Sequence, residues 1–263
     1  MPKSIARGLR KIRYAVFAIT AFLGYAVSAS ADVWQVGDET TYNQGVWGAP
    51  PNNVGAELLT AEFNTVYAST GGVIVGSPIS GFTMVFTDSA AVNAYLPEPG
   101  AYAPLDSNVL NPPANTTSSG AFGGDVLALE FNVDFSDAGF LPAASGIPFG
   151  DLVLEGFSSL PQIDGLTVRQ FLGDMNTLLG GGSSIVSIDD LGTTVNDLNS
   201  SFSFGMPSQF AQEHLVAPTV VTPTPEPSSL AIFIVGMLGL AATARRKAAR
   251  KLKLPAKQIC KED

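Results

Sequence analysis

The stretch GGDVLALEFNVDFSDAG, residues 123–139, decides whether the body of this chain is mainly helical. Two apolar periodicities coincide in it. Alternate positions are apolar, as in a strand, at Leu127, Leu129, Phe131, Val133 and Phe135. One helical face is apolar as well, at Phe122, Val126, Leu129 and Val133. Periodicity therefore leaves helix and strand open for residues 125–135, and the helical signals in the surrounding sequence favour a helix.

Two amphipathic helices are predicted further along the chain. Thr167 followed by Gln170 forms a capping box, and apolar residues continue at helical spacing until three glycines, residues 180–182, end the helix. Ser187 with Asp190 begins the second helix. We expect these two helices, joined by a glycine loop, to pack on each other as a helical hairpin.

Shorter elements complete the body. Further helices are predicted at residues 58–67, 88–96 and 208–215. Residues 73–75 and 82–86 have the composition of strands, and the glycine-containing turn between them predicts a β-hairpin. The predicted fold class is therefore mainly α with a small β hairpin, in a single globular domain.

Charge divides the chain into three parts. Five of its 14 basic residues lie within the first 13 positions, and eight lie from residue 245 onward, so that Arg169 is the single basic residue between them. Residues 32–224 hold 20 of the 23 acids, which gives this part a formal charge of −19. Basic ends around an acidic body are typical of a chain whose two termini both contain membrane-targeting segments. The acidic body argues against nucleic-acid binding, because the phosphate backbone would repel it.

The N-terminus has every part of a secretory signal. Residues 3–13 are basic, residues 14–27 are apolar, and small residues Ala29 and Ala31 precede Asp32. This order predicts a signal peptide, residues 1–31, that signal peptidase removes before Asp32 after the translocon has exported the chain. Cysteine occurs only at position 260 and histidine only at position 214, so neither a disulfide framework nor a Cys/His zinc site is expected in the exported body.

The C-terminus carries a second ordered signal. After the acidic globular domain, residues 32–215, comes a proline- and threonine-rich linker, residues 216–227, which should be extended. It ends in the motif Pro225, Glu226, Pro227 and Ser228, and residues 228–244 form a short apolar segment predicted to cross the membrane. Three basic residues, Arg245, Arg246 and Lys247, then act as a stop-transfer cluster that keeps residues 245–263 in the cytoplasm.

This ordered triple of Pro-Glu-Pro motif, apolar helix and basic cluster resembles the PEP-CTERM sorting signal. The resemblance implies an exported protein of a Gram-negative bacterium that an exosortase processes near the motif, in hosts that make exopolysaccharide. It implies a precursor anchored in the inner membrane with its body in the periplasm, and a mature protein at the cell surface or outside the cell. The fold then becomes a single extracytoplasmic domain between a signal peptide and a C-terminal membrane-spanning sorting helix. This tail continues further past its basic cluster than family tails usually do.

The body carries one weaker resemblance, and the chain contains a second copy of the tripeptide for comparison. Residues 123–139, with FGDLVL (149–154) and LTVRQFL (166–172), resemble a recurring secreted domain of uncharacterised function, which brings no catalytic residues. A second Pro-Glu-Pro tripeptide, residues 97–99, lacks the apolar run and the basic cluster, and is predicted to be a plain turn.

The body offers few catalytic groups. No nucleophile elbow is present, and His214 is explained as a cation at a helix C-terminus. Arg169 is expected to pair with an acid on a neighbouring element. Asp134 and Asp137 are candidate calcium ligands, although their spacing matches no EF-hand loop, and no other cofactor is expected.

The sequence thus predicts a non-enzymatic surface or matrix protein with a structural or binding role, possessing no assigned catalytic residue. One alternative is an exported hydrolase that acts on glycans through two carboxylates. The other is a calcium-dependent adhesin.

Overall fold

The computed structural model describes residues 33–219. The predicted signal peptide and most of the predicted linker and sorting signal lie outside the described residues. Within the described part, no helix is both long and apolar enough to cross a membrane. Helices and small β-sheets follow one another along the chain in this order: α2 (Gln44–Trp47), α3 (Val54–Tyr67), β1 (Val73–Gly76), β2 (Thr83–Phe86), α4 (Ser89–Tyr95), β3 (Val109–Leu110), α5 (Ala121–Asp137), η1 (Phe149–Asp151), β4 (Val153–Leu154), α6 (Val168–Leu179), α7 (Ile188–Asn199), β5 (Phe202–Ser203), β6 (Met206–Pro207), α8 (Gln209–His214) and β7 (Leu215–Val216).

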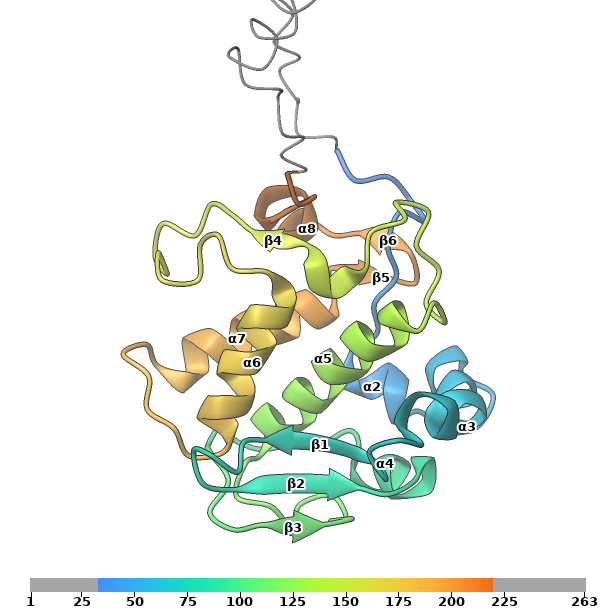
Figure 1. Ribbon diagram of the computed structural model, residues 1–263, viewed down its shortest axis with the longest axis vertical. Coiled ribbons are helices and arrows are strands. Elements are labelled where there is room, and N and C mark those ends of the chain that lie inside the picture. Colours follow the sequence, from blue (N-terminus) through green and yellow to red (C-terminus); the bar gives the residue numbers. More distant parts are fainter. Residues whose placement is uncertain (1–32, 220–263) are drawn as a thin grey trace, which may run out of the picture. The chain divides into compact units, whose positions relative to one another are not determined.

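Helix α5 is the centre of the body, and other elements surround it (Figure 1). The prediction that residues 125–135 are helical is confirmed. Most of the helix is buried, including neighbours such as Leu127, Ala128 and Leu129, so the burial does not follow a single face. A helix that is apolar on all sides belongs in the interior. This arrangement explains why its sequence also fits the alternation of a strand.

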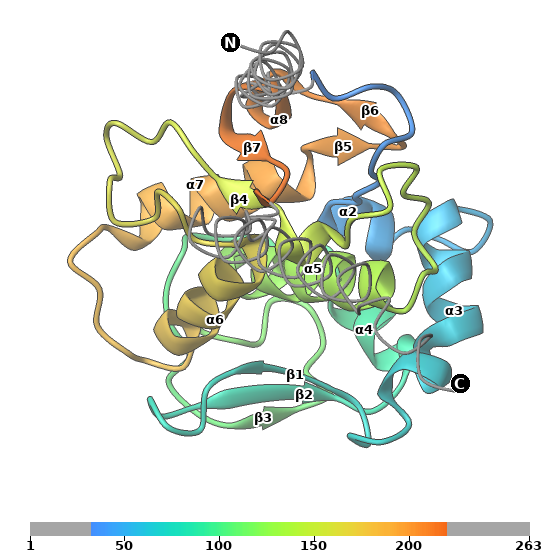
Figure 2. The same cartoon turned by 45° about the horizontal axis from the view of Figure 1, so that its top comes forward.

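Helices α6 and α7 begin where the sequence predicts. The Thr167 side chain accepts a hydrogen bond from the Gln170 backbone, and Gln170 returns one to complete the capping box. Ser187 caps α7 in the same way through the Asp190 backbone N–H. The predicted helical hairpin is wrong, because each helix packs mainly on α5 (Figure 2). The strongly apolar α5 offers both helices more surface than they offer each other.

The predicted hairpin is confirmed and belongs to a larger sheet. Strands β1 and β2 are antiparallel, with Val75 opposite Met84. Strand β3 adds to β2 in parallel, with Val109 opposite Met84. Strand β3 was not predicted, because a two-residue strand is too short to show any periodicity. Two further two-stranded sheets pair β4 with β7 and β5 with β6.

The three shorter helices lie close to their predicted positions. Helix α3 begins at Val54, four residues before its predicted start, and is capped by Asn53. Asp88 caps α4. Ser208 caps α8, as the predicted range for the last helix implies. Each of these side chains accepts a hydrogen bond from a free backbone N–H of the first turn, which stabilises a helix by about 1 kcal/mol.

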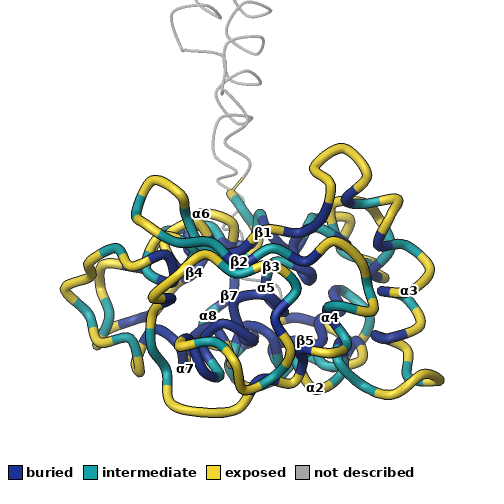
Figure 3. The backbone as a smooth tube through the Cα atoms, turned by 90° about the horizontal axis from the view of Figure 1, so that it is seen from below, coloured by how far each residue is buried: buried dark blue, intermediate teal, exposed yellow. Residues whose placement is uncertain are grey.

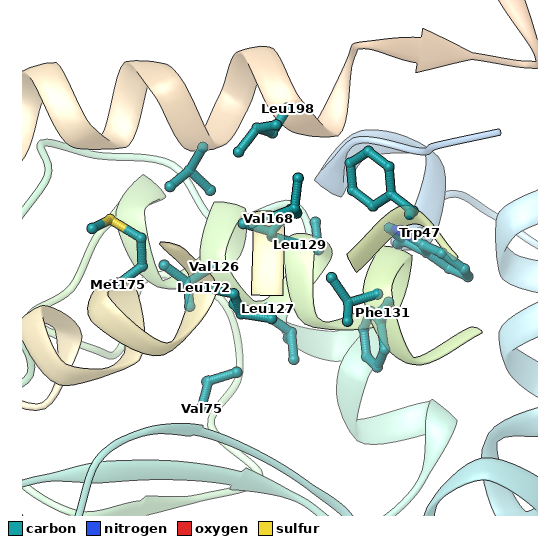
Figure 4. Packing of buried hydrophobic residues seen from close by; sticks show 14 of the residues in the cluster. Trp47, Val75, Val126, Leu127, Leu129, Phe131, Val168, Leu172, Met175 and Leu198 are labelled. Carbon is teal, nitrogen blue, oxygen red and sulfur yellow. The ribbon is translucent and has the colours of Figure 1, made fainter. Parts of the chain in front are cut away.

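One apolar core joins these elements, and the exposed residues lie mostly in the outer loops (Figure 3). Side chains of α5 meet those of α2, α6, α7 and β1 in its interior (Figure 4). The fully buried ring of Trp47 lies 5.3 Å from the Phe131 ring and 5.2 Å from the Phe135 ring, measured between centroids. Aromatic contacts of this kind add to the free energy of apolar burial.

The second Pro-Glu-Pro tripeptide is more than the plain turn that the sequence predicts. Glu98 is 2% exposed. Its carboxylate accepts a 2.7 Å hydrogen bond from the Asn115 backbone and a 3.5 Å bond from the Thr117 hydroxyl. Glu98 therefore fastens the long loop between β3 and α5 to the segment that follows α4. The sequence analysis did not predict this role, because the two donors, Asn115 and Thr117, are 17 and 19 residues away from Glu98 along the chain.

Candidate functional site

The targeting residues lie outside the part of the chain that the structure describes. They are the predicted signal-peptidase residues Ala29, Ala31 and Asp32, the sorting motif Pro225, Glu226, Pro227 and Ser228, and the stop-transfer residues Arg245, Arg246 and Lys247. The structure therefore bears on the body and on the two places where the chain enters and leaves it.

The entry and exit points of the body are joined. The Trp34 backbone exchanges two hydrogen bonds with the Gln212 side chain, at 3.1 and 2.8 Å. The Trp34 ring donates a third, of 2.7 Å, to the Leu215 carbonyl. The chain thus enters and leaves at the same end of the body (Figure 1). The exit is strand β7, which pairs with β4, so regular structure includes Val216, the first residue of the predicted linker.

Arg169 forms the ion pairs that the sequence led us to expect. Its guanidinium donates to both carboxylate oxygens of Asp137, at 2.7 and 2.8 Å, and to Asp151 at 3.3 Å. The three residues belong to α6, α5 and η1, so the contacts join three elements. Asp137, one of the two calcium candidates, is therefore already engaged by a cation of the chain itself.

Asp134, the other calcium candidate, is paired with an acid that the sequence analysis did not single out. Glu130 lies one turn earlier on α5, and its carboxylate accepts a 2.9 Å hydrogen bond from Asn176. Burial, and then the charge of Asp134, raises the pKa of Glu130 to about 7. Burial also raises the pKa of Asp134. The spacing of four residues would have revealed this pair, had the stretch been known to be helical.

A buried tyrosine adjoins the Glu130–Asp134 pair. The Tyr67 side chain is 6% exposed, and its hydroxyl has no hydrogen-bond partner although it lies beside Asp134. Burial, reinforced by the Asp134 charge, raises the pKa of Tyr67 well above its usual value. Two carboxylates and a free hydroxyl are oxygen ligands that a hard cation accepts. Within residues 33–219, no group of three or more Asp, Glu, His or Cys side chains is placed to hold a metal ion.

A second acidic network binds the segment between α4 and β3 to helices α2 and α5. Asp125 accepts hydrogen bonds of 3.0 Å from both the Gln44 amide and the Tyr102 hydroxyl. Gln44 in turn accepts one of 2.9 Å from the Glu98 backbone. Burial raises the pKa of Asp125 to about 6 in spite of these donors. Because every polar group in the network has a partner, its role is structural.

Glu39 is the most enclosed carboxyl of the body, at 1% exposed. Its nearest donor is the Ser145 hydroxyl. The loop that carries Ser145 is also fixed to the segment before Glu39, because the Ser145 backbone N–H donates to the Asp38 carbonyl at 3.1 Å. Burial raises the pKa of Glu39 from its usual 4.5 to about 7, against the opposing effect of that hydroxyl.

A groove of about 280 Å³ lies beside α6 and the start of α7. Its apolar part includes Ile163, Met175 and Leu191, and its single carboxylate is that of Asp174. A two-carboxylate hydrolase needs facing acids across a cleft, and this groove does not present them. His214 lies elsewhere, stacked on Phe157 with ring centroids 4.4 Å apart, which fits a structural role at the end of α8.

Comparison with known proteins gave no relative: no family model, no curated protein and no solved structure matches the chain. The assignment of a function therefore depends on the residues and on the geometry described above.

Proposed function

We propose that this chain is the precursor of an exported cell-surface or extracellular-matrix protein of the PEP-CTERM class, with a non-enzymatic structural or binding role. The observation that carries the proposal is the ordered C-terminal signal. The Pro225-Glu226-Pro227 motif, the apolar segment 228–244 and the basic cluster 245–247 follow a proline-rich linker. Each of these parts is common by itself, whereas their order at a C-terminus is specific.

The joined ends of the body support this proposal. Hydrogen bonds between Trp34 and both Gln212 and Leu215 hold the start of the mature chain against its exit. After removal of the predicted signal peptide before Asp32, the new N-terminus would lie close to the point where the chain leaves the body. Both predicted targeting segments are therefore attached at the same end of the body.

In the proposed route, the translocon exports the chain and signal peptidase cleaves before Asp32. Residues 228–244 then hold the precursor in the inner membrane with its body in the periplasm. An exosortase recognises the Pro-Glu-Pro region, and the processed protein reaches the surface or the exopolysaccharide. The formal charge of −19 on residues 32–224 keeps such a body soluble and favours cationic partners.

The test is the intact mass of the protein from the envelope and medium of its native host, for the wild type and for two variants. Wild type should lack residues 1–31 and everything beyond the Pro225-Glu226-Pro227 region. Glu226→Ala should retain the tail, whereas the matched control Thr224→Ala, just outside the motif, should be processed normally. A wild-type mass that extends to Asp263 would contradict the proposal and indicate a permanent single-span protein.

Cation binding is a second candidate function, and the Glu130–Asp134 pair favours it. The single arginine of the body is committed to Asp137 and Asp151, so the pair has no cation of its own at bonding distance. Calcium would compete with protons for these carboxylates. If it binds, calcium should raise the melting temperature of wild type but not of Glu130→Gln, while the control Glu155→Gln, at an exposed site, should respond like wild type. An unchanged melting temperature at millimolar calcium would remove this candidate.

A further inference from the structure

Four of the exposed large apolar side chains belong to two segments that meet at the end of the body where the chain enters and leaves. Val33 is 67% exposed, Val36 70%, Phe204 60% and Met206 60%. We call these four residues the apical patch. Exposed apolar residues scattered singly are ordinary, but a cluster of them marks a surface that meets something.

The patch is formed by two turns that contact each other. One is the turn at residues 35–38, and the other is the tip of the β5–β6 hairpin. The Gly37 backbone donates a 2.8 Å hydrogen bond to the Gly205 carbonyl, which joins the two tips. The Phe204 ring lies 5.5 Å from that of Tyr42 between centroids, so one side of it rests on the body while most of it stays exposed. The segment from residue 33 and the β5–β6 hairpin lie side by side in both views (Figures 1 and 2).

Phe204 occupies a backbone position that suits another residue type. Its φ is +53° and that of Gly205 is +81°, the left-handed conformation of a two-residue hairpin turn with positive φ at both central positions. Asn or Gly is favoured at the first of these, and a bulky side chain there is strained. The hairpin therefore keeps a large, exposed aromatic residue at a position where folding alone would favour a small polar one. Such an outlier points to a function.

The patch is close to the point where the chain leaves the body. Strand β7 ends at Val216, and Trp34, next to Val33, bonds directly to Leu215. Residues 220–227 separate the described body from the apolar segment 228–244. A proline-rich chain of eight residues can reach at most roughly 25 Å at about 3.1 Å per residue. Any surface in which residues 228–244 are embedded thus lies within reach of the patch.

We propose that the apical patch rests on the outer surface of the lipid bilayer that holds residues 228–244, so that the body of the precursor docks against the membrane before it is processed. This inference rests on the proposed function, because it requires the tail to be inserted. Val, Phe and Met side chains, presented by two turns, can enter the boundary between headgroups and acyl chains. The body is thereby held in one orientation, with the sheet β1-β2-β3 at the end away from the membrane (Figure 1).

A weak contact is sufficient because the tail supplies the proximity. A short flexible linker holds its two ends at an effective concentration on the order of millimolar. A patch whose affinity for lipid is only about millimolar is then occupied roughly half of the time, although the free body would not bind detectably. The bilayer is a better occupant than a second copy of the chain. A second body must be met by diffusion, whereas the linker brings every patch to the bilayer without a partner molecule.

The test places an environment-sensitive fluorophore on residues 32–263, the chain that remains after removal of the predicted signal peptide, inserted in vesicles of phosphatidylethanolamine and phosphatidylglycerol at three to one. In a Cys260→Ser background, which removes the single native cysteine, one sample is labelled at Val36→Cys. The matched control is labelled at Ile79→Cys, which is 98% exposed in the turn between β1 and β2. Nitroxide-labelled lipids should quench the label at position 36 and leave that at position 79 unquenched. Combining Phe204→Asn with Met206→Ser should abolish the quenching at position 36.

The outcomes separate the two proposals. If carbonate extraction releases the protein from the vesicles, the tail is not inserted, and both the proposed function and the docking fail. If the tail is inserted but the label at position 36 is not quenched, docking fails while the proposed function stands. Protection of position 36 from aqueous quenchers that disappears when the protein is diluted in excess lipid would assign the patch to a second copy, and would also overturn docking.

The single variant Phe204→Asn tells a docking residue from a structural one. Asparagine tolerates the positive φ of this position, so the melting temperature of the variant should be unchanged or higher while lipid contact weakens. If Phe204 served only to pack on Tyr42, the same change would lower the melting temperature and leave the contact of the remaining patch with lipid as it was. That result would refute the reading of the strained turn.

Discussion

The substitution Glu39→Gln should stabilise the folded body at pH 8 and leave its stability at pH 4.5 nearly unchanged. Glu39 is 1% exposed, and burial raises its pKa from 4.5 to about 7. At pH values between 4.5 and about 7, the Glu39 carboxyl is protonated in the folded state and ionised in the unfolded state. The free energy of unfolding must therefore fall as the pH rises through this window. Glutamine has nearly the same shape, stays neutral, and can still accept a hydrogen bond from Ser145.

The size of the effect follows from the two pKa values. One pKa unit corresponds to about 1.4 kcal/mol. The rise of the Glu39 pKa from 4.5 to about 7 therefore means that ionisation of Glu39 lowers the free energy of unfolding by about 3 kcal/mol at pH 8. With a urea dependence of about 2 kcal/mol per molar, typical of a domain of this size, the unfolding midpoint of the variant should exceed that of wild type by roughly 1.5 M. Partial solvent screening of the carboxyl reduces the effect, so about 3 kcal/mol and 1.5 M are upper values.

Urea unfolding, followed by the fluorescence of Trp34 and Trp47 between pH 4.5 and 8.5, measures both midpoints. Glu155→Gln is the control for replacing a carboxyl by an amide, because that side chain is exposed. Asp125 and Glu130 also contribute to the pH slope of wild type, so the difference between wild type and Glu39→Gln isolates Glu39. A difference that is the same at pH 4.5 and pH 8.5 would refute the reasoning, since it would show no proton uptake by Glu39 on folding.

The remaining predictions concern stability at neutral pH, with urea unfolding as the assay. Asn132→Ala should cost about 2–4 kcal/mol, because it leaves the buried backbone N–H and carbonyl of Tyr42 without partners; a loss under 1 kcal/mol would mean that water replaces the amide. Thr167→Ala should cost about 1 kcal/mol by removing the capping box of α6, and Thr167→Ser should restore most of it. Arg169→Met should cost about 1 kcal/mol or less, because its ion pairs are nearly half exposed; a much larger loss would show that three elements depend on it. Phe131→Ala should cost about 3–5 kcal/mol through loss of packing and a cavity in the core.

Local sequence signals determined most of the helices of this protein. The capping residues Thr167 and Ser187 placed the starts of α6 and α7 because the hydrogen bonds that begin a helix join residues two or three positions apart. The β1–β2 hairpin was predicted for the same reason, since its two strands are adjacent in sequence. Where the partners of an interaction are neighbours along the chain, the sequence contains the whole interaction.

Only the tertiary structure decided how these elements pack. The sequence left residues 125–135 open between helix and strand because both periodicities are present, and burial on every side of α5 is the reason that both are apolar. The helical hairpin was wrongly predicted because the helix propensities of α6 and α7 do not tell which surface each helix packs against. In the structure that surface belongs to α5. Strand β3 was not predicted because its two residues form a strand only through their pairing with β2.

The candidate sites divide in the same way. The predicted export and sorting signals are contiguous segments, so residues 1–31 and 225–247 could be interpreted from the sequence without a fold. The Glu130–Asp134–Tyr67 cluster and the apical patch unite residues more than 60 and more than 160 positions apart. Raised carboxyl pKa values and exposed apolar clusters arise from solvent exclusion and proximity in three dimensions. For this protein, the sequence by itself determined the local helix starts and predicts the targeting signals, and the tertiary structure alone decided which side chains share a surface or a buried site.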